Sequence, residues 1–193
     1  MKVRLSPSGP VLFETGIGAR LRLAESQSTM GGSLAVPTAQ SAICTDGFGG
    51  AQPIVVSLAN PKENLYYRAD LRLDLFNVSS SHNCVVCLYL ESSVDAGATW
   101  TTRSKNAHVI QPALGVGSED NGQAREASLA VVMTLGESFG VVDGTTASIR
   151  FRASARLTTG TATDVEVSSL ASASPETGLA GTIHLQLEEC TAA

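Results

Sequence analysis

Strict alternation of apolar and charged residues most constrains how this chain can fold. From Tyr67 to Phe76 the sequence reads YRADLRLDLF. Successive side chains of a β-strand point to opposite faces, so this segment predicts a strand with Leu71, Leu73 and Leu75 facing a core. The outward positions are then Arg68, Asp70, Arg72 and Asp74. Their alternating signs indicate cross-strand pairing on a solvated face rather than a catalytic carboxylate pair.

Residues 83–103 are predicted to form a β-hairpin. The first half, NCVVCLYLE, is apolar on both faces, which is typical of a strand near the middle of a sheet or sandwich. It leads into SSVDAGATW, where Asp95 can accept hydrogen bonds from turn amides and Gly97 can adopt positive φ. We expect Trp100 to fold back over this turn. Together with the preceding strand, the hairpin predicts a three-strand meander from Tyr67 to Arg103.

Five further strands follow from alternation or from short apolar runs. They are expected at residues 19–25, 54–58, 127–135, 147–153 and 181–188. The side chains predicted to face inward are Leu21, Leu23, Ile149, Phe151, Ile183, Leu185 and Leu187. About eight principal strands without a convincing amphipathic helix indicate an all-β, antiparallel β-sandwich, most simply a jelly roll. An immunoglobulin-like sandwich is the alternative, although its usual size is nearer about 100 residues.

The domain organisation is predicted to be simple. Residues 1–18, with several prolines and glycines, are expected to form an N-terminal arm, and residues 19–193 a single β-sandwich domain. Residues 26–52 are rich in Ser, Thr, Gly and Ala, which predicts a long surface loop. Residues 115–122 are predicted to form an exposed tip, and residues 165–167 a short strand.

Charge and cysteine content restrict the possible partners. The formal net charge is −5 and the basic residues are scattered, so direct nucleic-acid binding is not expected. No run approaches the roughly 18 apolar residues of a membrane span, and the first residues lack the apolar segment of a signal peptide. The four cysteines are too dispersed for a disulfide scaffold and are expected to be reduced. Only 16% of residues are charged, which favours a surface partly covered in an assembly.

One local motif is complete. Residues 93–100 match the Asp-box pattern S-x-D-x-G-x-T-W at every fixed position, which are Ser93, Asp95, Gly97, Thr99 and Trp100. The segment therefore resembles the hairpin repeated in sialidases and other propellers, and found singly in various β-rich carbohydrate-associated and viral proteins. The resemblance covers 8 of 193 residues and implies a structural turn remote from any chemistry. A sialidase would need several copies, an arginine cluster, a tyrosine nucleophile and a longer chain.

Other candidate chemistry is sparse. Cys84 and Cys87 have C-x-x-C spacing, but residues three apart on a strand point to opposite faces, so both are predicted to be small core residues. His82, His108 and His184 are far apart in sequence, with His184 expected on an outward face. No G-x-S-x-G elbow or phosphate-cradling loop occurs. We therefore predict no catalytic residues, no cofactor and no metal.

These observations lead to a function hypothesis. In general character the chain resembles a bacteriophage or other viral virion protein of the capsid decoration, cement or minor capsid type. That resemblance implies a non-enzymatic homo-oligomer, for example a trimer, which contacts other capsid or virion proteins, is made in the host cytoplasm and resides in the virion. The alternative is a carbohydrate- or receptor-binding module of a viral fibre or spike. A third hypothesis, a glycoside hydrolase fragment, requires measurable turnover.

Overall fold

The computed structural model describes residues 3–4, 12–13, 20–29, 34–45, 47–77, 82–111, 125–133, 136–161, 165–167 and 182–191. In chain order the strands are β1 (Val3–Arg4), β2 (Leu12–Phe13), β3 (Arg20–Thr29), β4 (Leu34–Ala35), β5 (Ser41–Cys44), β6 (Gly47–Phe48), β7 (Val55–Ala59), β8 (Tyr66–Asn77), β9 (Cys84–Ser93), β10 (Thr101–Ile110), β11 (Arg125–Met133), β12 (Ser148–Thr159), β13 (Val165–Val167) and β14 (Thr182–Cys190). A single turn of 3-10 helix, η1 (Gly136–Phe139), lies between β11 and β12.

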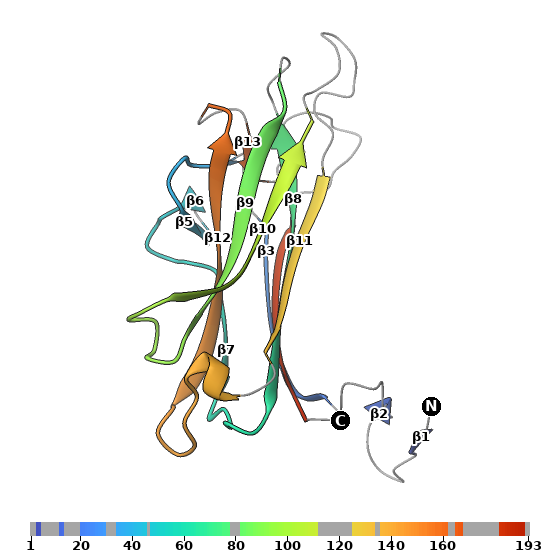
Figure 1. Cartoon of the computed structure of the whole chain (residues 1–193), viewed down its shortest axis with the longest axis vertical. Coiled ribbons are helices and arrows are strands. Elements are labelled where there is room, and N and C mark those ends of the chain that lie inside the picture. The colour runs from blue at the N-terminus through green and yellow to red at the C-terminus, as the bar shows by residue number, and fades with distance from the viewer. Residues whose placement is uncertain are drawn as a thin grey trace.

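Eight of these strands have five or more residues, and they form two antiparallel sheets packed face to face (Figure 1). The β8 sheet has the order β3-β14-β8-β11, and the β9 sheet has the order β7-β12-β9-β10. Numbered along the chain, the long strands therefore run 1-8-3-6 and 2-7-4-5. This is the strand order of a jelly roll, so the predicted all-β antiparallel sandwich is confirmed.

The predicted three-strand meander is wrong. β9 and β10 pair as a hairpin, with Thr101 opposite Ser92, but β8 belongs to the other sheet and pairs with β11, β13 and β14. The alternation of apolar and polar residues predicts which side chains of a strand face the core, but it does not predict which of the two sheets the strand joins. The chain crosses from one sheet to the other between β8 and β9, and long-range pairing decides this.

The core fills the space between the two sheets. Leu71, Leu73 and Leu75 of β8 are at most 1% exposed, as predicted. The other residues predicted to face inward on β12 and β14 are fully buried as well: Ile149, Phe151, Ile183, Leu185 and Leu187. Burying a leucine side chain contributes roughly 1.5–3 kcal/mol. The edge-to-face contact of Phe151 with Phe139 of η1, at 5.3 Å between ring centroids, closes the core at one end.

The prediction for the first long strand is wrong about its faces. Leu21 and Leu23 are 49% and 36% exposed, whereas Arg22 turns toward the sandwich. Residues in register on neighbouring strands share a face. Arg22 pairs with Glu189 and Leu23 with Glu188, and a register shift beside Glu189 leaves Leu21 bulged. Because a slip of one residue moves every side chain to the opposite face, the register with β14 overrides the leucine pattern.

The predicted loop at residues 26–52 is also partly wrong. β3 continues to Thr29, and β5 pairs with β12 inside this segment. Val36, Ile43 and Cys44 are fully buried there. These apolar residues are separated by small polar ones, so no periodicity marks them. The predicted tip at residues 115–122 lies outside the described part of the chain, and the predicted arm at residues 1–18 stays a prediction.

Candidate functional site

The Asp-box residues form the turn between β9 and β10, which projects from the sandwich (Figure 1). Asp95 Oδ1 accepts hydrogen bonds from Ser93 Oγ at 2.7 Å and from the Thr99 amide at 3.0 Å, and Asp95 Oδ2 accepts one from Thr99 Oγ1 at 2.5 Å. The Gly97 amide donates to Ser93 Oγ at 2.8 Å. The bonds from Thr99 and Ser93 favour the ionised carboxylate and hold the pKa of Asp95 well below its usual range.

Trp100 lies back over this turn. A Cβ atom at Gly97, whose φ is +95°, would lie 3.4 Å from the Trp100 ring. The Trp100 ring also contacts Arg152, whose guanidinium carbon lies 4.4 Å from the ring centroid. Arg150 Nη1 donates to the Ala96 carbonyl at 2.6 Å. Two arginines of β12 therefore attach the turn to the β9 sheet.

A buried carboxylate lies beside the base of this turn. Glu91 is only 5% exposed, although it lies on the outer face of the β9 sheet. Its carboxylate accepts from Arg152 Nε at 2.8 Å, from Ser154 Oγ at 2.5 Å and from Gln40 Nε2 at 2.9 Å. Arg152 thus bridges the carboxylate and the Trp100 ring. Every hydrogen-bond partner of Glu91 is more than 50 residues away in sequence, so no local motif marks this cluster.

A second buried carboxylate closes one end of the sandwich. Glu189, 3% exposed, accepts from Arg22 Nε at 2.8 Å and from Arg22 Nη2 at 2.6 Å. The Tyr67 hydroxyl lies 3.1 Å from Glu189 Oε2, accepts from the Lys62 amide at 2.6 Å and lies 2.8 Å from the Lys62 carbonyl. Burial raises the pKa of Tyr67 far above its usual range, and the carboxylate of Glu189 adds to this effect.

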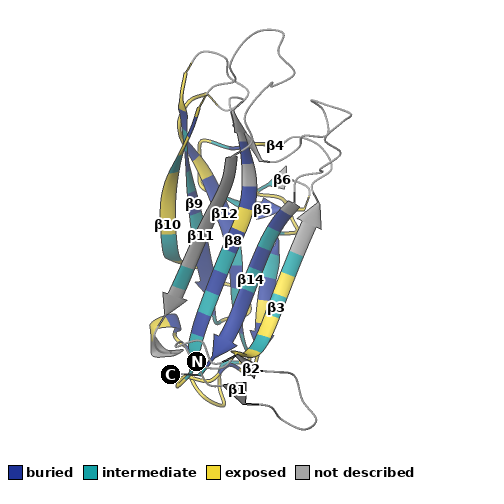
Figure 2. Cartoon of the chain, turned by 90° about the vertical axis from the view of Figure 1, so that its right-hand side faces the viewer, coloured by how far each residue is buried: buried dark blue, intermediate teal, exposed yellow. Residues whose placement is uncertain are grey.

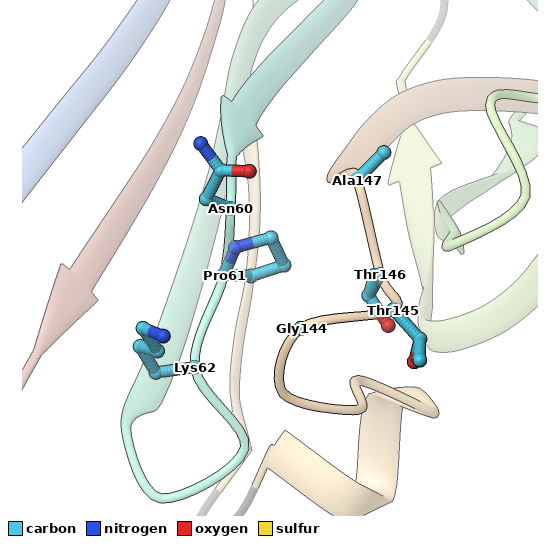
Figure 3. Close-up of a pocket in the computed structure, with 7 residues that line it drawn as sticks. All are labelled: Asn60, Pro61, Lys62, Gly144, Thr145, Thr146 and Ala147. Atoms are coloured by element: carbon cyan, nitrogen blue, oxygen red, sulfur yellow. The ribbon is translucent and has the colours of Figure 1, made fainter.

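A shallow pocket of about 350 Å³ lies at the same end (Figure 3). It is lined by Asn60, Pro61, Lys62, Gly144, Thr145, Thr146 and Ala147. The two threonine hydroxyls already bond to the backbone of Val142, since Thr146 Oγ1 accepts at 2.7 Å and Thr145 Oγ1 donates at 3.2 Å. Lys62 is the one ionisable side chain in this lining. Figure 3 shows the Lys62 side chain pointing away from the turn at residues 144–147, so the pocket presents mainly backbone groups and no acid–base pair.

The cysteines and histidines are dispersed over the fold. Cys84 is buried, whereas Cys87 is half-buried on the outer face of β9, so the prediction that both are core residues is wrong for Cys87. His184 lies on the outer face of β14, as predicted. Within the described ranges, no three His, Cys, Asp or Glu side chains are grouped so that they could hold a metal ion. The described residues also include no helix that is long and apolar enough to span a membrane.

The outer face of the β8 sheet carries a set of charged side chains on β3, β14 and β8. Figure 2 shows β3, β14, β8 and β11 side by side, with no described segment drawn across them. Described side chains of three register rows face outward: Leu23, Glu188 and Arg68; then Glu25, Gln186 and Asp70; then His184 and Arg72. Among the described side chains two ion pairs lie on this face, with Arg68 Nε 2.7 Å from Asp70 Oδ2 and Arg20 Nη2 2.5 Å from Glu188 Oε1.

Comparison with known proteins gives weak structural similarity and no match in sequence. No family model matches it, and no curated protein matches it in sequence. A solved structure of the Eiger TNF protein from S. frugiperda shares 11% identity, covering 90% of this chain and 95% of that one, with a TM-score of 0.38. A solved structure of infectious bursal disease virus, Gt strain, shares 15% identity with a TM-score of 0.28. This chain aligns over its whole length but spans only 41% of that viral chain.

Proposed function

We propose that this chain is a non-enzymatic structural protein of a virus particle, of the capsid decoration, cement or minor capsid type. The observation that carries the proposal is the open outer face of the β8 sheet. On it, exposed Leu21 and Leu23 adjoin alternating positive and negative side chains. Charged rows flanking exposed apolar side chains suit adhesion to other subunits, because they provide both buried area and electrostatic complementarity.

The buried carboxylates support a structural role. Glu91, Glu188 and Glu189 are each 8% exposed or less, and each is paired with an arginine: Arg152, Arg20 and Arg22 respectively. A general acid or base needs a carboxyl group that can exchange a proton with a substrate. These three carboxylates instead neutralise cations and join separate strands. In this role the protein would be made in the host cytoplasm and would function in the virion.

The proposal is tested on the particles themselves. Particles purified on a density gradient from cultures that express the chain are analysed by mass spectrometry and by immunogold labelling of intact particles. We expect the protein to co-sediment with the particles in a fixed ratio to the major shell protein. Absence of the chain from purified particles would refute the proposal. Labelling of intact particles, but not of emptied and stripped ones, would indicate an exterior position.

A carbohydrate- or receptor-binding module is the alternative, and the geometry gives it less support. Tyr67 is fully buried, so it cannot stack on a sugar and its replacement would test core packing. Arg152 covers part of the Trp100 ring. Tyr66 and Tyr89 remain half-buried. Glycan-array binding that is lost on Tyr89→Ala, with folding retained, would favour this alternative. Measurable turnover of sialosides would favour the hydrolase hypothesis.

A further inference from the structure

We propose that a second copy of this chain packs against the outer face of the β8 sheet, with Glu25 of one copy beside Arg72 of the other. The inference rests on the proposed function, in which the chain acts through subunit contacts, and it names the partner and the contact. Both residues are exposed and both point outward from the same sheet, Glu25 on the edge strand β3 and Arg72 on β8.

The two charges are too far apart to form a cross-strand pair within one copy. They lie two strands apart in the sheet and one outward row apart along it, which places their Cα atoms roughly 12 Å from each other. The register neighbour of Glu25 is Gln186, which already donates to Glu188 at 2.7 Å. The register neighbours of Arg72 are His184 and Ser128, and neither carries a negative charge. One face therefore offers a carboxylate at its edge and a guanidinium nearer its middle.

The other described charges on this face are already paired, so covering them costs less than covering isolated charges. Arg68 and Asp70 form an ion pair at 2.7 Å, and Arg20 and Glu188 form another at 2.5 Å. Glu188 is only 8% exposed in the single chain, so most of its desolvation has already occurred. Covering the face would leave no lone charge at these pairs. Among the described side chains neither Glu25 nor Arg72 has an ion-pair partner, and a second copy can supply each of them with the other.

The apolar contribution comes from the same edge. Leu21 and Leu23 are 49% and 36% exposed, and Leu23 lies two residues from Glu25 on the outward side of β3. A contact that places the β3 edge over a neighbouring face would bury both leucines. Because Glu25 and Arg72 lie on the same outer face, the face of one copy is complementary in charge to the face of another copy. Self-complementarity points to a second copy of this chain rather than to a different partner.

The experiment is a charge swap read by sedimentation equilibrium of the full chain. Wild type is expected to associate, Glu25→Arg and Arg72→Glu are each expected to weaken association roughly ten- to hundredfold, and the double variant is expected to restore it. Leu23→Asp should also dissociate the assembly. Val142→Asp is the matched control, because Val142 is 51% exposed on a turn away from this face and its replacement should leave association unchanged.

Three outcomes would overturn the inference: a monomeric wild type, single variants that associate like wild type, or a double variant that stays dissociated. If a single variant fails to fold by circular dichroism, chains carrying Glu25→Cys and Arg72→Cys with different tags are mixed and oxidised. A disulfide joining the two tags supports the contact, and its absence refutes it. If the self-association experiments fail but the wild-type chain is found in purified particles, only the proposed contact is refuted and the proposed function is retained. If the chain is absent from particles, the proposed function is refuted whatever the association experiments show.

Discussion

Arg22 and Glu189, 167 residues apart in the chain, form a two-bond ion pair at 2.8 and 2.6 Å that joins β3 to β14. The same guanidinium group also bonds to the carbonyl oxygens of Ala59 and Asn60, in the chain that leaves β7. One arginine thus connects the edge of the β8 sheet to the end of the β9 sheet. This contact explains why β3 turns Arg22 inward and leaves its leucines outside.

Replacement of Arg22 should destabilise the fold. Arg22→Ala leaves Glu189 buried without its cation, and we expect a loss of about 3 kcal/mol in the free energy of unfolding. The value is at the low end of the range for broken buried pairs because the Arg22 side chain is 37% exposed and partly screened by water. Urea denaturation measures the change. The control is Lys105→Ala, an exposed substitution expected to stay within about 0.5 kcal/mol of wild type.

Alkaline pH should destabilise the protein through Tyr67. Burial raises the pKa of its hydroxyl above that of an unfolded tyrosine, which is about 10. As the pH rises, the unfolded state therefore loses this proton before the folded state does. The free energy of unfolding is unaffected by this titration below about pH 10 and falls as the pH rises above that value. Thermal melting between pH 8 and 11 measures the slope. In Tyr67→Phe the slope should be shallower, and an unchanged slope would contradict the assignment.

Acid should weaken the β9–β10 turn through Asp95. The hydrogen bonds from Thr99 and Ser93 hold its folded pKa below that of an unfolded aspartate, which is about 3.9. The stabilisation of the folded state by ionised Asp95 is therefore present above about pH 4 and is lost as the pH falls toward the folded-state pKa of Asp95. Asp95→Asn should lower the melting temperature at pH 7, and the gap to wild type should narrow at pH 3. A gap that is independent of pH would refute the role of the charge.

Two glycines allow backbone strain and side-chain contact to be separated. Gly97 and Gly144 have φ of +95° and +75°, and a Cβ would touch the Trp100 ring only at Gly97. Gly144→Ala should cost about 1–2 kcal/mol from the left-handed backbone alone. Gly97→Ala should cost more, because it also displaces Trp100 from its place over the turn. Chemical denaturation compares the two, and Trp100 fluorescence should shift only in Gly97→Ala.

Much of the fold could be predicted from local pattern. The leucines of β8, the inward residues of β12 and β14, and the hairpin of β9 and β10 follow from period-two alternation, because a pleated strand places every second side chain on one face. β5 escaped prediction, because isolated Ile43 and Cys44 carry no period even though the sandwich buries both. The buried Glu91 cluster beside the β9–β10 turn could not be predicted, because Glu91 lies 61 residues in sequence from Arg152, its ion-pair partner.

By itself, the amino-acid sequence determined that this protein is made of strands, which side chains of most strands face a core, and where one tight turn lies. These properties depend on neighbours only a few residues apart. The tertiary structure alone decided which sheet receives β8, which face β3 presents and which arginine neutralises each buried glutamate. Those outcomes depend on the register between distant strands, and a shift of one residue in that register exchanges the inside and the outside of a strand.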